Sequence, residues 1–491
     1  MDRTSAKPLH RQLYEGYRDA IVARLLRAGQ RLPSTRTLAG DLSLSRITVL
    51  NAFDQLLAEG YVESRVGAGT FVASSVPDEL PARPSRASSP AGSDRKARRR
   101  GSYRVDDVAR HEPGPWFRGR GPFSVAQPPL DRFPWRVWSR LVARAARRLD
   151  SELLHYTGPM GYKPLREAVA EYLRTSRAVR CEADQLMVVG GAQHALDVSA
   201  RALLDPGDPV WIEEPGYFGA RRALSLAGCR LVPVPVDEEG LDVESGIARY
   251  PRARAAYVTP SHHVPLGVTM SASRRLRLLD WARRSGAWIV EDDYDSEYRY
   301  GSQPITSLQG LDGDSRVVYA GTLTKMIFPS LRLGYIVVPP DLIDAFMAVR
   351  RATDFFCPIF PQVVLTDFIR EGHLGRHIRR MRKLCESRRT ALVEAIAHEF
   401  GEELRILGDR AGMFLATTLP KGCDDRAVAS EAARRGLWAP PLSECYLGRA
   451  RLSGLVLGYG GFDEETIRAG VRLLRQVVDA TRVNSGRRPV R

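Results

Sequence analysis

The sequence predicts two folded parts: a small N-terminal domain of three helices and a β-hairpin, and a large α/β domain with a mostly parallel sheet. The small domain is predicted by an apolar residue at every fourth position over residues 9–26, followed by two shorter capped helices and two short strands around a glycine turn. The large domain is predicted by buried strands that alternate with helical stretches from about residue 111 onward. A chain of 491 residues is also too long for one ordinary core.

Each element of the N-terminal part has its own signal. An apolar helix face runs from Leu9 to Leu25. Ser34 and Ser45 are expected to cap the second and third helices, because a serine oxygen at that position accepts a backbone N–H. Two strands joined by a glycine turn follow over residues 61–73. Three helices and a hairpin in this order are typical of a winged helix-turn-helix.

Between the two parts the composition changes. Residues 76–101 are rich in Pro, Ser, Ala and Arg, with a basic cluster over 95–100. Such a stretch cannot bury enough apolar surface to order itself. We therefore expect a DNA-binding domain over residues 1–75, a flexible basic linker over 76–110 and a ligand-binding domain over 111–491.

Charge points to a polyanionic partner. The formal net charge is +16, and residues 1–110 hold 19 Lys+Arg against 12 Asp+Glu. A basic region joined to a helix-turn-helix indicates nucleic acid, and we expect double-stranded DNA.

Composition also argues against several other kinds of protein. No apolar run approaches the roughly 18 residues that a membrane span needs, so no membrane partner is expected. The N-terminus has no apolar signal-peptide core, so we expect a cytoplasmic protein. Six cysteines are scattered without a CxxC pair, which favours buried reduced thiols over disulfides or metal sites.

Chemically active side chains follow the predicted strands of the large domain. The strands are expected at residues 186–189, 209–212, 255–258, 288–290 and 317–320, with helical stretches such as 192–204, 217–227 and 271–285 between several of them. Asp292 and Lys325 each follow one of these strands, and Arg332 comes seven residues after Lys325. Open α/β sheets place ligands at the carboxyl ends of their strands. A carboxylate for a pyridine nitrogen, a lysine for an imine and an arginine for a phosphate suit pyridoxal 5'-phosphate (PLP).

The segments 32–42 and 43–49 resemble the GntR family of winged-helix regulators, over about residues 7–75. A recognition helix turns its N-terminal residues toward base edges in the major groove. Arginine grips guanine through two hydrogen bonds, while hydroxyls suit phosphate. The residues expected to contact DNA are Arg36, Ser45, Arg46, Thr48, Asn51 and Gly67. Ile47 departs from the family, which often has a polar residue there.

Seven further motifs resemble the fold-type I aminotransferases over about residues 111–480, and the fusion resembles the MocR subfamily of GntR regulators. They are Tyr156–Gly161, Gly190–Gln193, Glu213–Tyr217, Thr259–His263, Glu291–Asp295, Gly321–Lys325 and Phe328–Tyr335. The resemblance implies a fold-type I PLP-dependent transferase domain with a smaller C-terminal α/β subdomain. It also implies PLP as the cofactor and a homodimer formed through the large domain.

The resemblance implies a role for each matching residue. Lys325 would carry the Schiff base, Asp292 would pair with the pyridine nitrogen, Tyr294 would bond the ring hydroxyl and Tyr217 would stack on the ring. The phosphate would be held by Gly191, Ala192, Gln193, Thr322 and Arg332. Tyr156 would reach the phosphate across a dimer interface, and His262 would line the site.

Two departures bear on activity. Leu266 replaces a hydroxyl-bearing residue of the family. Aminotransferases place an arginine near their C-terminal strand to grip the substrate carboxylate, and Val456 stands at that place here. Arg449 and Arg451 lie upstream and are candidates to take its place. Without such a clamp an amino acid loses orientation as well as affinity.

Three functions remain open at this point. The first is a transcription regulator in which PLP, alone or joined to an amine or amino-acid effector, modulates DNA binding. The alternative is an active PLP-dependent aminotransferase with a vestigial DNA-binding head. The third is a structural DNA-binding protein whose pocket holds no ligand.

Overall fold

The structure is a computed structural model that describes residues 2, 5–65, 67–75, 102–110, 114, 116, 119–125, 127–148, 151–301, 305–408 and 410–485. The chain divides into two compact units, Met1–Arg99 and Arg100–Arg491, and each is considered by itself. Most of the expected linker, including its basic cluster, lies outside the described residues. The last part of that range differs from the expectation, because Tyr103–Arg110 forms helix α4, which packs on helix α8 (Phe218–Ala227).

The N-terminal unit is a winged helix-turn-helix. Its elements are α1 (Leu9–Val22), α2 (Thr35–Asp41), α3 (Arg46–Ala58), β1 (Val62–Arg65) and β2 (Gly69–Val72), with β1 and β2 antiparallel. The oxygens of Ser34 and Ser45 accept the backbone N–H groups of Thr37 and Thr48, each at 3.1 Å. Helix α1 ends four residues earlier than its apolar pattern predicts, because Arg24 takes a left-handed conformation (φ 57°) that a helix cannot continue through.

The large unit is built on a mixed sheet of eight strands in its described residues, in the order β3-β10-β9-β8-β7-β4-β5-β6. The run β9-β8-β7-β4-β5 is parallel, whereas β10 is antiparallel to both neighbours and β6 to β5. The strands are β3 (Leu186–Val189), β4 (Pro209–Glu214), β5 (Arg230–Asp237), β6 (Gly240–Leu241), β7 (Ala255–Val258), β8 (Trp288–Asp293), β9 (Val317–Thr322) and β10 (Gly334–Val337).

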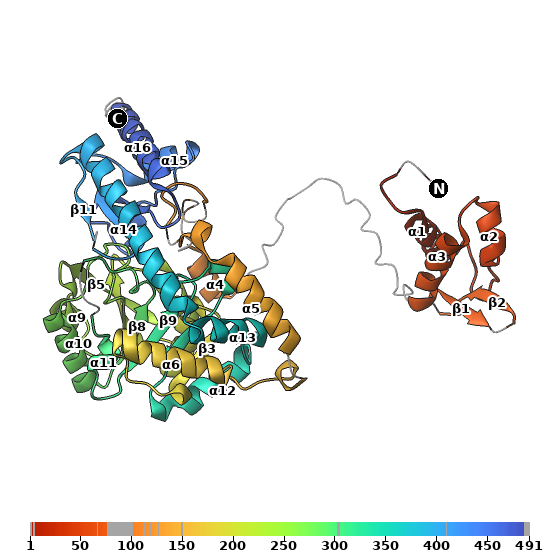
Figure 1. Cartoon of the computed structure of the whole chain (residues 1–491), viewed down its shortest axis with the longest axis horizontal. Coiled ribbons are helices and arrows are strands. Elements are labelled where there is room, and N and C mark those ends of the chain that lie inside the picture. The colour runs from red at the N-terminus through yellow and green to blue at the C-terminus, as the bar shows by residue number, and fades with distance from the viewer. Residues whose placement is uncertain are drawn as a thin grey trace, which may run out of the picture. The chain divides into compact units, whose positions relative to one another are not determined.

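Helices cover both faces of this sheet (Figure 1). One face packs on α7 (Ala192–Leu203), α8 and α12 (Ile343–Thr353). The other packs on α5 (Trp135–Arg148), α6 (Lys163–Arg177) and α13 (Ile359–Arg370) near β3, and on α9 (Val243–Arg249), α10 (Ala272–Ser285) and α11 (Leu308–Leu311) near β7. Side chains alternate between the faces along each strand. The result is a three-layer α/β/α domain.

A smaller C-terminal subdomain is joined to this domain by the long helix α14 (His373–Phe400). The first turns of α14 pack in the core beside β3 and β10, and its later turns pack in the core of the subdomain. The subdomain contains the antiparallel sheet β11-β12-β13 and two further helices. Their bounds are β11 (Ile406–Leu407), β12 (Phe414–Thr418), β13 (Gly454–Gly458), α15 (Asp425–Arg434) and α16 (Glu464–Ser485). No helix in the described part of the chain is both long and apolar enough to cross a membrane.

The separate cores predict separate unfolding. Leu56 is fully buried in the core of the N-terminal unit, whereas the adjacent Leu57 is 44% exposed. Leu56→Ala should destabilise the N-terminal unit by about 2–5 kcal/mol, because it removes buried methyl groups and leaves a cavity. Differential scanning calorimetry should show one transition moved down and the large unit's transition unchanged. Leu57→Ala is the control and should leave both in place; one merged transition that moves as a whole would contradict two independent cores.

Candidate functional site

The N-terminal unit presents the predicted DNA-contacting residues on its surface. Arg36, Arg46, Asn51 and Gly67 are exposed, and Ser45 is exposed at the N-terminus of α3. The Ser45 and Thr48 hydroxyls contact each other at 2.7 Å. They therefore stabilise the first turn of α3, in addition to lying at the end of the helix that is predicted to contact DNA. Ile47, in the first turn of α3, is 71% exposed. The first turn therefore offers one guanidinium and one apolar side chain to a groove.

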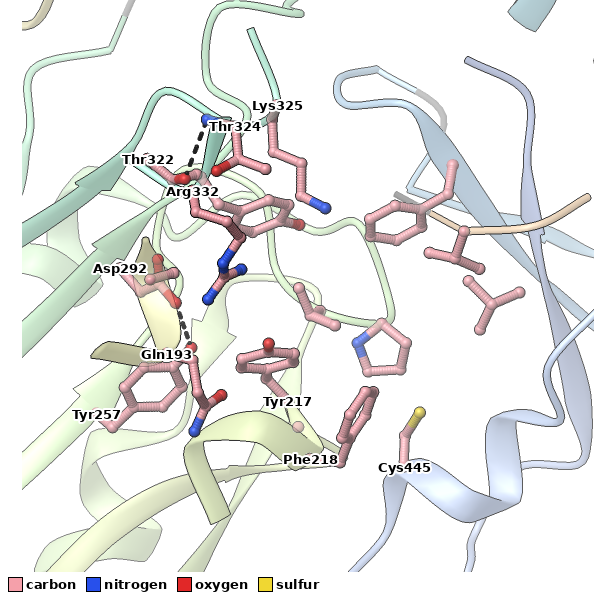
Figure 2. Close-up of a pocket in the computed structure, with 18 residues that line it drawn as sticks. Gln193, Tyr217, Phe218, Tyr257, Asp292, Thr322, Thr324, Lys325, Arg332 and Cys445 are labelled. Atoms are coloured by element: carbon pink, nitrogen blue, oxygen red, sulfur yellow. Dashed lines mark hydrogen bonds between the residues drawn. The ribbon is translucent and has the colours of Figure 1, made fainter. Parts of the chain in front are cut away.

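In the large unit, a cavity of about 310 Å³ lies at the carboxyl ends of the parallel strands. Figure 2 shows Lys325, Arg332 and Asp292 directed into it, with Tyr217 between them and Phe218. These residues come from separate loops and strand ends. The lining also includes the predicted residues Ala192, Gln193, Tyr294 and Thr322.

Lys325 supplies the amine of this cavity. It follows β9 by three residues, lines the cavity and is half-buried. Burial disfavours the ammonium form more than Asp295 and Asp292 favour it, so the pKa of Lys325 is lowered to about 8. A lysine with a lowered pKa is a nucleophile near neutral pH.

Asp292 supplies a carboxylate at the end of β8. The sequence predicts a strand that ends at residue 290, before Asp292. In the structure β8 extends to Asp293, so Asp292 lies inside the strand. Its Oδ2 accepts a hydrogen bond of 2.8 Å from the hydroxyl of Tyr257, and its Oδ1 is buried without a hydrogen-bond partner among the described residues. Burial raises the pKa of Asp292 to about 7. An unpaired buried carboxylate oxygen is the group that a protonated ring nitrogen satisfies.

An anion cradle lies on the other side of the cavity. Gly191 immediately precedes helix α7 with a positive φ of 90°, and it lies beside the guanidinium of Arg332. A Cβ added to Gly191 would lie 3.6 Å from the guanidinium carbon of Arg332, in ordinary contact with it, and its backbone would be strained because φ is positive. The N–H groups of a helix N-terminus and a guanidinium together suit a phosphate.

Two of the predicted lining residues also bond to neighbouring groups, and His262 does not line the cavity. The Gln193 amide donates to the Gly219 carbonyl at 2.9 Å, so it fixes the start of α8 as well as lining the cavity. The Tyr294 hydroxyl lies 3.0 Å from His262 Nδ1. His262 is buried behind it, bonded through Nδ1 to Asp295 at 2.9 Å, and is outside the lining.

Tyr156 is not brought to the cavity within this chain. Its side chain is 88% exposed and contacts the rings of Phe355 and Phe356 edge-on. A role for Tyr156 at the phosphate therefore requires a second copy of the chain.

The residues considered for binding a substrate carboxylate lie in two different cavities. Val456 lines the cavity, while Arg449 and Arg451 line another cavity together with Glu214 and Arg249. Leu266 is buried in the apolar cluster that includes Val456. The two upstream arginines are thus not among the residues that line this cavity.

Sequence reasoning missed Tyr257 and the apolar wall of the cavity. Tyr257 was recognised only as part of a buried strand, and its hydroxyl reaches Asp292 across the neighbouring strands β7 and β8. The apolar wall comes from distant segments and includes Val125, Phe414 and Cys445. No local motif marks these residues.

Among the described residues, one group of His, Cys and Asp side chains lies close enough together to bind a metal ion. His194, Asp354 and Cys357 place their ligand atoms within 4.8 Å of one another. The buried guanidinium of Arg350 contacts all three, at 3.2 Å from Asp354, 3.4 Å from His194 and 3.8 Å from Cys357 Sγ. A fixed positive charge at this position disfavours a cation, so we assign these contacts to packing.

The cavity fits PLP by its own chemistry. An amine of lowered pKa, an unpaired carboxylate oxygen and an anion cradle are the three groups that its aldehyde, ring nitrogen and phosphate need. The ring of Tyr217 is half-buried and lies between them.

Comparisons with known proteins agree with both units. Residues 9–72 match the family model "Bacterial regulatory proteins, gntR family", and residues 124–455 match "Aminotransferase class I and II". The probable rhizopine catabolism regulatory protein MocR of Rhizobium meliloti is 43% identical over 97% of this chain and 94% of its own length. The pyridoxine biosynthesis transcriptional regulator PdxR of Corynebacterium glutamicum is 29% identical over 93% of both chains.

Solved structures resemble the large unit. The α-aminoadipate aminotransferase LysN of Thermus thermophilus, complexed with N-(5'-phosphopyridoxyl)-L-leucine, is 27% identical with a TM-score of 0.69, covering 78% of this chain and 96% of that one. Homologues with this fold are PLP-dependent. Since a whole-length relative and two family models agree on the order of domains, the chain belongs to the MocR-type transcription regulators, which join a gntR-family DNA-binding domain to an aminotransferase class I and II domain.

Proposed function

We propose that this regulator is a cytoplasmic homodimer whose affinity for operator DNA depends on PLP, alone or together with an amine effector, in the cavity of the large unit. The observation that carries the proposal is the convergence of Lys325, the unpaired Oδ1 of Asp292 and the cradle of Gly191 and Arg332 on one cavity. A ligand changes DNA affinity only by binding one arrangement of the protein better than another. The names of the relatives, which include a regulator of pyridoxine biosynthesis, favour such a ligand.

Each residue of the cavity would act on a different part of PLP. Arg332 and the N-terminus of α7 would bind its phosphate, and Tyr217 would pack on the ring. Asp292 would hold the proton on the ring nitrogen, which removes the cost of its buried and unpaired oxygen. Bound PLP supplies an aldehyde that reacts with primary amines. Lys325 Nζ would occupy the position next to that aldehyde.

Dimerisation would complete the site. Tyr156 is almost fully exposed on a segment that also exposes Leu154, at 72%. Exposed apolar side chains gathered on one surface favour an interface. We place this surface against a second copy of the chain, where Tyr156 of each subunit would reach the phosphate of the other.

An active aminotransferase is the second candidate. The amine and the carboxylate of the cavity would permit it, but Val456 occupies the place of the carboxylate-binding arginine, and Arg449 and Arg451 line a different cavity. An amino acid would then be held without the two-bond clamp that orients it for reaction. This observation favours sensing over turnover.

The groove assignment of α3 predicts the effect of Arg46. Arg46→Ala should weaken binding to the operator by about 1–3 kcal/mol, because arginine reads guanine with two hydrogen bonds. Arg46→Lys should lose most of the preference for operator over unrelated DNA but keep the salt dependence of binding. The positive charge remains, whereas the planar guanidinium that donates two hydrogen bonds is lost. Fluorescence anisotropy with operator and with unrelated DNA measures both. Equal operator affinity in Arg46→Ala and the parent protein would exclude this arginine from base recognition.

The lowered pKa of Lys325 predicts how PLP uptake depends on pH. The neutral amine is the reactive form, and its fraction grows as the pH rises through about 8. The rate at which the visible absorption band of PLP-loaded protein forms should therefore rise and level off near that pH, well below the 10.5 of an ordinary lysine. Stopped-flow absorbance measures the rate. A rate that keeps rising toward 10.5 would mean that the lysine is solvated.

PLP should change DNA binding through Lys325. Adding PLP to the parent protein should alter its affinity for the promoter region beside its own gene about fivefold or more, the lower end of ordinary coupling free energies. Lys325→Ala should lose both the visible band and the change in affinity. Lys383→Ala, which removes an exposed lysine from the same unit, is the control and should behave as the parent. Identical affinities with and without PLP in the parent would refute regulation by this ligand.

A further inference from the structure

The cavity has a polar end and an apolar wall. The polar end holds Lys325, Asp292 and Arg332, whereas the wall includes Val125, Val264, Pro265, Phe218, Phe414 and Val456. The wall is backed by further apolar side chains, because Leu266, Phe414, Leu442 and Val456 form one buried cluster. Whatever occupies the space beyond PLP therefore meets hydrocarbon on this side of the cavity.

The β-sheet of the C-terminal subdomain directs the side chain of Val456 into the cavity, where it forms part of the apolar wall. Val456 is the middle residue of β13, and its neighbours Leu455 and Leu457 pack in the subdomain core on the opposite face. Its backbone N–H donates to the Pro440 carbonyl at 2.9 Å, and its strand pairs with β12. Because side chains alternate along a strand, a different side chain at this position would also face the cavity.

The cavity holds few positive charges. Among the described residues that line it, the cationic side chains are Lys325 and Arg332. Arg332 lies against Gly191 in the anion cradle, and Lys325 is the amine at the polar end. A carboxylate placed against the apolar wall would lose its water without gaining a guanidinium, which is strongly unfavourable.

We propose that the effector is a primary amine without a carboxylate group, and that Val456 is the residue that sets this preference. Its amino group would face the Lys325 end of the cavity and its uncharged body would lie against Phe414 and Val456. This inference rests on the proposed function, because it names the class of ligand for the same site. PLP without any second ligand is the competing explanation of the apolar wall.

Matched pairs of ligands test this class directly. The PLP-loaded full chain is titrated with 3-methylbutylamine and leucine, which differ only by the carboxylate beside the amine. A second pair, pentylamine and 6-aminohexanoate, differs by a carboxylate at the far end. The shift of the visible band and isothermal calorimetry both give dissociation constants. In each pair the amine should bind at least tenfold more tightly than its acid.

Variants of Val456 test the residue. Val456→Arg should lower the dissociation constant of leucine relative to 3-methylbutylamine by at least tenfold, because it supplies a guanidinium at the end of β13. Val456→Leu is the matched control, since it enlarges the side chain without charge and should keep the preference for the amine. The titrations of the parent protein do not depend on the folding of either variant.

The outcomes separate this inference from the proposed function. Leucine binding as tightly as 3-methylbutylamine to the parent would overturn the proposed ligand class. The same conclusion would follow if PLP alone changed DNA affinity and neither amine perturbed the visible band or released heat. A parent protein that forms the visible band, prefers the amines and yet binds DNA equally in all states would instead overturn the proposed regulation while leaving the ligand class in place.

Discussion

The site depends on the register of three adjacent strands. Thr322 at the end of β9 pairs with Gly334 at the start of β10, and Gly334 pairs with Val189 at the end of β3. The loop that carries Lys325, the turn that precedes β10 and the start of α7 are therefore brought to one edge of the sheet. Gly334 makes this possible, because a Cβ there would lie 3.0 Å from the Gly191 Cα. A shift of one residue in this pairing would turn the side chains to the opposite face and take the cradle apart.

The acidic residues at the end of β8 point to two different sides of the strand. Asp292 faces the cavity, whereas Asp293 on the opposite face receives an ion pair of 2.7 Å from the buried Arg177 and a hydrogen bond of 2.6 Å from Tyr319. Glu291 accepts the backbone N–H groups at the start of α11. These contacts hold the strand end in place beneath the site. They also explain how two of the three carboxylates are tolerated in a buried strand, since Glu291 and Asp293 each have partners, whereas Oδ1 of Asp292 has none among the described residues.

Much of this arrangement could be predicted from the sequence because the informative residues sit next to their strands. The order of elements, both serine caps and the position of Lys325 follow from local patterns, and the family and fold are confirmed by the comparisons. What could not be predicted depends on contacts between distant segments. Examples are the Tyr257 hydroxyl on Asp292, the apolar wall drawn from both subdomains and the assignment of Arg449 to a different cavity.

The N-terminal unit keeps its core apart from the side chains that are predicted to contact DNA. Its interior is made by residues such as Val49, Ala52 and Leu56, while Arg46 and Asn51 point outward from the same helix. Exchanging outward residues costs little folding stability. Gene duplication followed by a few such exchanges could therefore redirect a descendant of this protein to new promoters without altering the cavity of its large domain, so that the two parts evolve independently.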